Sequence, residues 1–85
     1  MAEKRLTVMI VDDSSTVRRT GELILKRENY NVVGVSDGYE ALVAVEKIKP
    51  DVIFMDVMME RLDGYDTCQI IKSSSSDIAE IPIIM

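Results

Sequence analysis

Three aspartates follow two short apolar runs of the sequence. Asp12 and Asp13 come directly after the run 7–11, and Asp56 comes directly after the run 52–55. If these runs form neighbouring parallel strands, their carboxyl ends lie at one edge of a sheet, where open α/β folds bind ligands. Three carboxylates gathered there repel one another, so the arrangement requires a cation.

The types of residue available restrict which cation would bind. Carboxylate oxygens are hard ligands, and the chain contains no histidine and a single cysteine, Cys68. This donor set favours Mg2+, which commonly engages one or two carboxylates together with phosphate oxygens. The absence of histidine also excludes Ser-His and Cys-His nucleophile pairs and histidine-ligated zinc within this chain.

A purely structural role for the aspartates is the alternative interpretation. Aspartates after strands commonly cap the following helix, and Asp13, before Ser14 and Ser15, is placed to do so. For one isolated aspartate, capping is the simpler explanation. Capping does not explain why all three residues fall at the same end of two candidate strands, so the joint pattern favours a site.

The elements that must position these residues alternate between two patterns. Four apolar runs without strict polar alternation predict strands buried on both faces, over residues 7–11, 32–35, 52–55 and 81–85. Segments 14–28, 37–48 and 63–72 have apolar residues at helical spacing, and 73–76 predicts a flexible loop. The order β-α-β-α-β-α-β predicts one α/β domain over residues 1–85, with a doubly wound parallel sheet and right-handed crossovers.

Composition limits the classes of function. The 85 residues suffice for one small domain, and 47% hydrophobic with 29% charged residues is typical of a folded one. A net charge of -5 predicts repulsion from nucleic acid phosphates and anionic membrane surfaces. The single cysteine fits a reducing compartment, and the first apolar run is too short for a signal peptide or a membrane span. We therefore expect a cytoplasmic protein that binds neither nucleic acid nor membrane through this domain.

Two motifs resemble a known family. The segments MIVDDS at 9–14 and DVIFMDVMMERLDGYD at 51–66 are similar to those of response-regulator receiver domains, and the resemblance covers essentially the whole chain. It implies the flavodoxin-like fold and a role in two-component signalling. The module would be a switch rather than a metabolic enzyme.

The resemblance also implies roles for individual residues. Asp56 would accept a phosphoryl group, with Asp13 bound directly to Mg2+ and Asp12 acting through water. Met58 would offer its backbone carbonyl to the same ion. The donor would be a phosphohistidine on a sensor histidine kinase or a histidine phosphotransfer protein.

The sequence departs from the family pattern in two places. Glu60 occupies a position where the family normally has a proline that stiffens the loop. The sequence stops at Met85, before the switch Ser or Thr, the lysine that bridges to the phosphoryl group and the last helix of the family, so we expect a fold truncated after its fourth strand. Lys49 and Lys72 are not expected to replace that lysine, because neither lies at a strand end facing the site.

These departures leave other functions open. An exposed fourth strand predicts self-association, so the alternative function is a phosphorylation-independent, receiver-like interaction or oligomerisation module. A magnesium-dependent phosphatase also uses an aspartate nucleophile, but such enzymes carry a second Asp two residues later, where this chain has Met58.

Several other residues are given structural interpretations. The methionines Met55, Met58, Met59 and Met85 are expected to fill the core, and Cys68 to be a small buried hydrophobe. Gly64, after Asp63, is expected to supply a permissive backbone for a turn.

Overall fold

A four-stranded parallel sheet forms the centre of the molecule in the computed structural model, which describes residues 5–85. The strand order is β2-β1-β3-β4, with β1 and β3 in the middle. The strands are β1 (Thr7–Val11), β2 (Asn31–Val35), β3 (Val52–Met55) and β4 (Ile83–Ile84). The prediction of a parallel sheet with the first and third strands adjacent is confirmed.

The fourth strand is shorter than the predicted run 81–85. Ile81 turns into the core and is 7% exposed, and Pro82 has no amide hydrogen to donate to a neighbouring strand. Pro82 contributes only its carbonyl, which accepts from the amide of Ile53 at 2.9 Å. Only two residues therefore remain for β4, and they form one edge of the sheet.

Four helices connect the strands. They are α1 (Ser15–Arg27), α2 (Gly38–Ile48), α3 (Gly64–Lys72) and the single turn α4 (Ser76–Ala79). The three long helices begin where the sequence predicted, each behind a side chain that accepts from a first-turn amide: Ser14, Asp37 and Asp63. The predicted flexible loop at 73–76 is wrong in its last residue, because Ser76 begins α4 and Ile78 is buried in the core.

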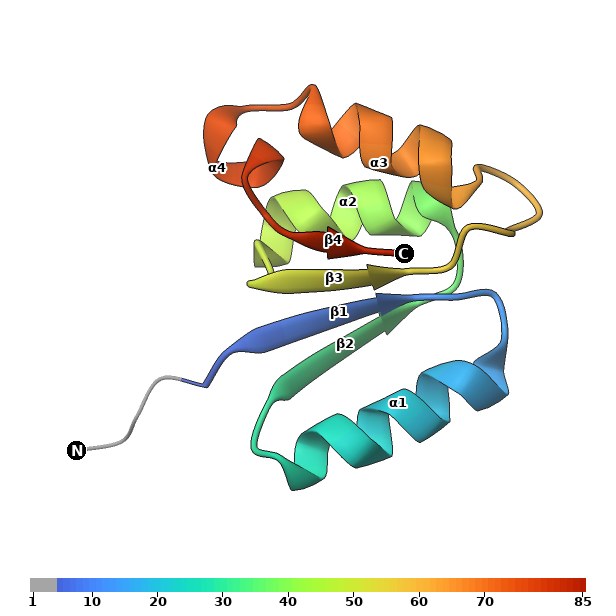
Figure 1. The fold of residues 1–85 in the computed structure, drawn as a ribbon, viewed down its shortest axis with the longest axis vertical. Helices are drawn as coiled ribbons and strands as arrows, with labels where there is room; N and C mark the ends of the chain where they lie inside the picture. The colour runs from blue at the N-terminus through green and yellow to red at the C-terminus, as the bar shows by residue number, and fades with distance from the viewer. Residues whose placement is uncertain (1–4) are drawn as a thin grey trace.

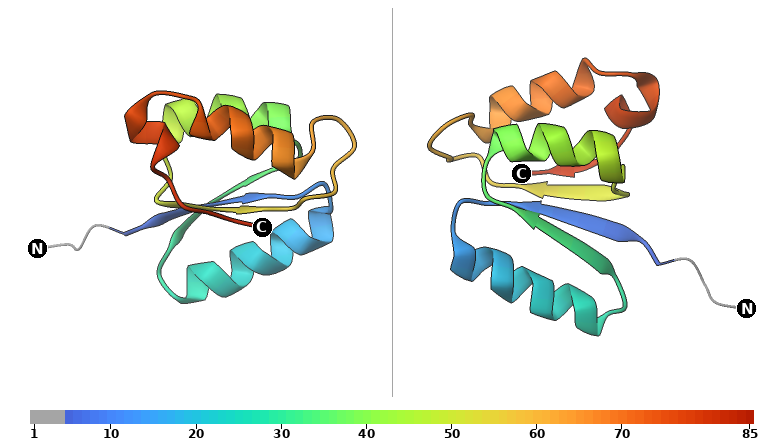
Figure 2. Two further views of the ribbon diagram at one scale, coloured as in Figure 1. Left: turned by 45° about the horizontal axis from the view of Figure 1, so that its top comes forward. Right: turned by 180° about the vertical axis from the view of Figure 1, so that it is seen from behind.

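The helices are divided unequally between the two faces of the sheet. Figures 1 and 2 show α1 alone on one face, while α2 and α3 cover the other with α4 beside them. The main core lies between the sheet and α2, α3 and α4, and it includes Met9, Ile53, Ile71 and Ile78. No residue of α1 is buried, and Ile24 is 55% exposed.

The methionines do not all belong to the core. Met55 and Met59 are buried, as expected, but Met58 is 80% exposed and Met85 is 52% exposed. The core interpretation is therefore wrong for Met58 and Met85. Cys68 is only partly buried. Within residues 5–85, no helix is both long enough and apolar enough to cross a membrane.

Candidate functional site

Strand register brings the three aspartates together. Val11 of β1 pairs with Met55 of β3, so the residues that follow them, Asp12 and Asp56, leave the sheet side by side. The Asp56 amide donates to the Val11 carbonyl at 2.8 Å, which continues the pairing one residue past the strands. The carboxylates of Asp12, Asp13 and Asp56 each offer an oxygen atom, and these oxygens all lie within 4.8 Å of one another.

The local hydrogen bonds distinguish Asp12 from Asp13. One carboxylate oxygen of Asp12 accepts from the Ser14 amide at 2.9 Å, and the Asp12 carbonyl accepts from the Arg18 guanidinium at 2.6 Å. Among the residues described, no hydrogen bond engages the Asp13 carboxylate, which is exposed. The helix cap is Ser14, whose hydroxyl accepts from the Val17 amide at 3.2 Å. The capping interpretation of Asp13 is therefore wrong.

Two open hollows flank the aspartates. One, of about 340 Å³, has Asp12 and Asp56 at one end and is otherwise lined by apolar side chains that include Val17, Phe54 and Ile84. The other, of about 480 Å³, is lined by Val57 and by Asp13, Met58, Met59, Glu60, Asp63 and Tyr65. The carboxylates can thus be reached from solvent by a reacting group.

The donor set fits a hard divalent cation. All three side chains are carboxylates, and no thiolate or imidazole accompanies them. Three anions within 4.8 Å of one another are costly unless a cation offsets their charge. Oxygen-only coordination of this kind suits Mg2+ better than a softer transition metal.

The loop 57–63, between β3 and α3, passes close beside the site; we call it the acceptor loop. Its Met58 amide donates to the Asp56 carboxylate at 3.3 Å. Gly64, which follows the loop as the first residue of α3, does not have a positive φ, so the prediction of a permissive turn residue is wrong. The reason for glycine is space: a Cβ there would overlap the carbonyl oxygen of Asp56 and lie 2.8 Å from Cα of Val57.

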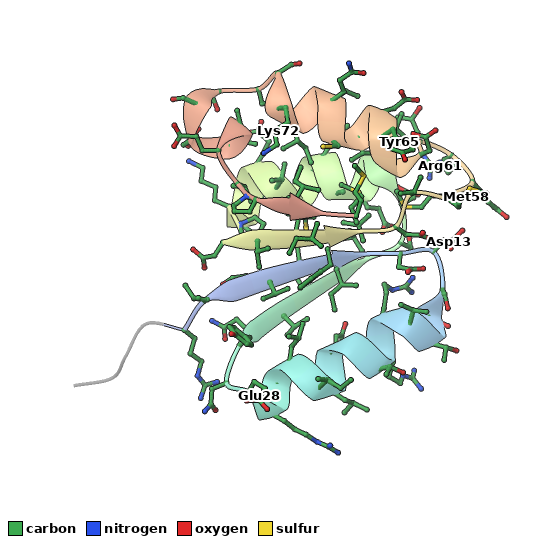
Figure 3. The ribbon with its side chains drawn as sticks, viewed as in Figure 1. Asp13, Glu28, Met58, Arg61, Tyr65 and Lys72 are labelled. Atoms are coloured by element: carbon green, nitrogen blue, oxygen red, sulfur yellow. The ribbon has the colours of Figure 1, made fainter. Side chains whose placement is uncertain are left out.

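Neither candidate lysine replaces the bridging one. Lys72 donates to the carbonyls of Ala79 and Ile81 at 3.0 and 2.8 Å, and Lys49 forms an ion pair with Asp77 at 2.8 Å. Figure 3 shows Lys72 far from Asp13 and Met58, toward the opposite end of the molecule. The prediction about both lysines is confirmed.

Sequence reasoning missed one charged contact near the site. Arg61 of the acceptor loop forms an ion pair with Asp37 at 2.9 Å and lies over the ring of Tyr39. Arg61 and Asp37 are 24 residues apart, on segments whose proximity depends on the tertiary fold. The sequence gives one hint of this contact: Arg61 directly follows Glu60, the position where the family normally has a proline.

Family comparison agrees with this geometry. Residues 8–85 match the model of the response regulator receiver domain. The chain belongs to this family. The receiver domain is a signalling module rather than a metabolic enzyme, so this part of the prediction is confirmed.

Relatives and solved structures extend the comparison. Protein PilG of Pseudomonas aeruginosa is 46% identical over 94% of this chain, and the probable transcriptional regulator ycf27 of Guillardia theta is 43% identical over 98% of it. The receiver chain spans 58% of PilG and 31% of the ycf27 protein.

The solved structures confirm the receiver fold. The chemotaxis protein CheY4 of Vibrio cholerae superposes with a TM-score of 0.88 at 31% identity, over 94% of this chain and 66% of that one. A putative response regulator from Chloroflexus aurantiacus gives 0.87 at 35% identity, over 94% and 65% respectively.

Proposed function

We propose that this receiver domain accepts a phosphoryl group on Asp56 and acts as a cytoplasmic signalling switch. The observation that carries the proposal is the convergence of Asp12, Asp13 and Asp56 at the carboxyl edge of the sheet, in a chain of the receiver family. Asp56 is the candidate acceptor because it occupies the acceptor position of the receiver motif in the segment 51–66, and it borders the apolar hollow. Its half-buried carboxylate accepts a hydrogen bond from the Met58 amide and borders an open hollow that a donor can enter.

The same residues are the proposed ligands of a Mg2+ ion. The carboxylates of Asp12, Asp13 and Asp56 and the backbone carbonyl of Met58 would hold it, with Asp13 as a direct ligand because no hydrogen bond within residues 5–85 engages its carboxylate. Asp12, which already accepts from the Ser14 amide, would act through water. When bound, Mg2+ supplies positive charge that offsets the carboxylates and the phosphoryl oxygens.

The proposed reaction is an in-line displacement at phosphorus. A carboxylate oxygen of Asp56 forms the new P–O bond while the P–N bond of a phosphohistidine breaks. The electron pair of that bond stays on the imidazole nitrogen, and a proton from solvent gives neutral histidine. Because this chain has no histidine, the donor is a separate molecule or domain, a sensor histidine kinase or a histidine phosphotransfer protein.

Intact mass after incubation with Mg2+ and a small acyl phosphate tests the proposal. The parent chain should gain one phosphoryl group, and Asp56→Asn should gain none. Asp66→Asn, which changes an exposed aspartate in the first turn of α3, is the matched control and should still react. No gain in the parent, or an equal gain in Asp56→Asn, would reject Asp56 as the acceptor.

A second candidate function, phosphorylation-independent oligomerisation, is supported by the exposed end of the sheet. Phe54 is 37% exposed, Ile84 is 50% exposed, and β4 is an edge strand of two residues. Apolar edge strands favour pairing with another chain. Light scattering over a range of protein concentrations would separate the two functions, because a chain that stays monomeric at every concentration cannot act by oligomerisation.

A further inference from the structure

The acceptor loop has few hydrogen bonds of its own. Backbone hydrogen bonds hold only its two ends: the Asp56 amide bonds to the Val11 carbonyl, and the Gly64 amide bonds to the Val57 carbonyl at 3.0 Å. Within residues 5–85, no backbone-to-backbone hydrogen bond involves 58–62. Position 60 is a glutamate, so no proline ring restricts the backbone either. Contacts made by side chains must therefore fix the middle of the loop.

Two side chains of the loop make such contacts: Met59 is buried in the core, and Arg61 reaches the start of α2. Its guanidinium donates to the Oδ2 atom of Asp37 at 2.9 Å, and its central carbon lies 4.8 Å from the centre of the Tyr39 ring. The Asp37 side chain is only 12% exposed, and its other oxygen accepts from the Glu40 amide at 2.8 Å. A nearly buried carboxylate that already caps α2 is a rigid partner for a loop cation.

The residue between Asp37 and Tyr39 brings the loop closer still. A Cβ at Gly38 would lie 2.7 Å from the carbonyl oxygen of Leu62 and 3.0 Å from its Cβ, so only glycine lets the loop approach this near. Residues 61–62 of the loop thus contact residues 37–39 in three ways: by an ion pair, by a close backbone approach and by a cation–π contact. Figure 3 shows Arg61 and Met58 in the same loop at this end of the molecule.

We propose that Arg61 is a positioning residue that holds the acceptor loop against the start of α2, and thereby fixes the Met58 carbonyl beside the acidic cluster. This inference rests on the proposed function, because it assigns a purpose to the loop's geometry. Met58 lies between two fixed points: Asp56, at the end of β3, and Arg61 of the acceptor loop, which is held at the start of α2. Arginine suits this role because one planar group binds a carboxylate and lies over an aromatic ring at the same time.

Three substitutions isolate the contact. Arg61→Ala removes it, and Arg61→Lys keeps the charge but not the planar geometry. Asp37→Asn removes the partner's charge while keeping a side chain that caps α2 equally well. Lys49→Ala is the control, because it breaks a different ion pair, with Asp77, that is exposed on both sides and lies away from the loop. Arg61 is itself largely exposed, so its replacement should leave the fold intact.

Two measurements read the effect. Backbone 15N order parameters of 58–62 should fall in Arg61→Ala from about 0.85 toward 0.6, and stay unchanged in Lys49→Ala. In Arg61→Ala the Mg2+ concentration at half-maximal phosphorylation should rise about tenfold, which is the smaller end of the loss seen when groups that orient metal ligands are removed. The rate at saturating Mg2+ should change less. Arg61→Lys should fall between, and Arg61→Ala combined with Asp37→Asn should add little to Arg61→Ala alone.

The outcomes separate this inference from the proposed function. Unchanged order parameters in Arg61→Ala, or an equal change in Lys49→Ala, would overturn the role of Arg61. Lower order parameters with an unchanged Mg2+ requirement would make Arg61 a structural contact only, which also overturns it. If the parent chain takes up no phosphoryl group, the proposed function fails. In that case the order parameters, together with direct titration of Mg2+ into the parent and Arg61→Ala, still decide the role of Arg61.

Discussion

Two glycines near the site are there because other atoms come close to them. Gly38 is approached by the Thr67 hydroxyl and by Leu62, and Gly64 by the backbone of Asp56 and Val57. Neither has a positive φ, so backbone freedom is not the reason for glycine at these positions. At the scale of the single residue, the acceptor loop keeps its path because no side chain occupies these two points.

Substitution at Gly64 should therefore cost both stability and activity. In Gly64→Ala the new methyl group meets backbone atoms, which cannot move away as a flexible side chain can. We expect a loss of about 1–3 kcal/mol in the free energy of unfolding, measured with urea, and slower phosphorylation. Gly34→Ala is the control, since its methyl group would meet the end of the Glu22 side chain. It should change stability by less than about 0.5 kcal/mol, and equal losses would contradict this explanation.

The exposed pair Lys49–Asp77 gives a prediction about pH. The hydrogen bond from Lys49, and then that from the Ser75 hydroxyl, lower the pKa of Asp77 from 3.8 to about 2. Because the folded-state pKa is depressed, the contribution of Asp77 to stability is present above pH 3.8 and is lost as the pH falls toward about 2.

Carboxyl 13C titration by NMR checks this assignment. In Lys49→Ala the pKa of Asp77 should rise toward 3.8. In Lys72→Ala it should stay low, because Lys72 donates to the carbonyls of Ala79 and Ile81. A low pKa that survives the loss of Lys49 would show that another group is responsible.

At the scale of the elements, the two faces of the sheet contribute unequally to stability. The face under α2 and α3 contains the core, with Ile71 fully buried, whereas α1 has no buried residue. Gly21 lets α1 approach β1, since a Cβ there would lie 2.7 Å from Cδ1 of Ile10. Most of the apolar burial that stabilises the fold is thus on one side.

The same substitution at two isoleucines, one on each side of the sheet, tests this difference in stability. Ile71→Ala should lower the free energy of unfolding by about 2–5 kcal/mol, because it leaves a cavity in the core. Ile24→Ala, at a side chain 55% exposed on α1, should lower it by less than about 1 kcal/mol. Chemical denaturation of both variants decides the matter, and similar losses would show that α1 is packed more tightly than this structure has it.

Local sequence signals predicted most of the fold. Apolar residues at helical spacing predicted the three long helices, and apolar runs predicted the strands. The prediction failed where tertiary packing overrides local pattern: Ile78 and Ile81 are drawn into the core, which creates α4 and shortens β4. In the site, the three aspartates were predicted from their places after strands. The Arg61–Asp37 contact was not, because no local pattern links residues so far apart in the chain.

At the scale of the whole molecule, the site joins distant parts of the chain. Asp12 and Asp13 follow β1, and Asp56 follows β3, so their carboxylates meet only after the sheet has formed. A cation that binds all three should therefore favour the folded state over the unfolded one. Without a cation, the mutual repulsion of the carboxylates should weaken the fold.

Thermal unfolding with Mg2+ and after chelation tests this coupling. Mg2+ at a hundred times its Kd should stabilise the parent by about 2.7 kcal/mol, and chelation should remove that gain. Asp13→Asn should behave in the opposite sense: more stable than the parent under chelation, since one repelling charge is gone, and less stabilised by Mg2+. Equal responses of parent and variant would show that Asp13 takes no part in binding.

The pairing of Val11 with Met55 has a consequence for protein engineering. A shift of one residue between β1 and β3 would turn Asp56 toward the other face of the sheet and separate it from Asp12. A chain cut between α2 and β3 would leave the acidic pair on one piece and Asp56 on the other. The amount of cation bound would then report the fraction of molecules whose two pieces have associated in the native register. The site could therefore be used to measure correct assembly.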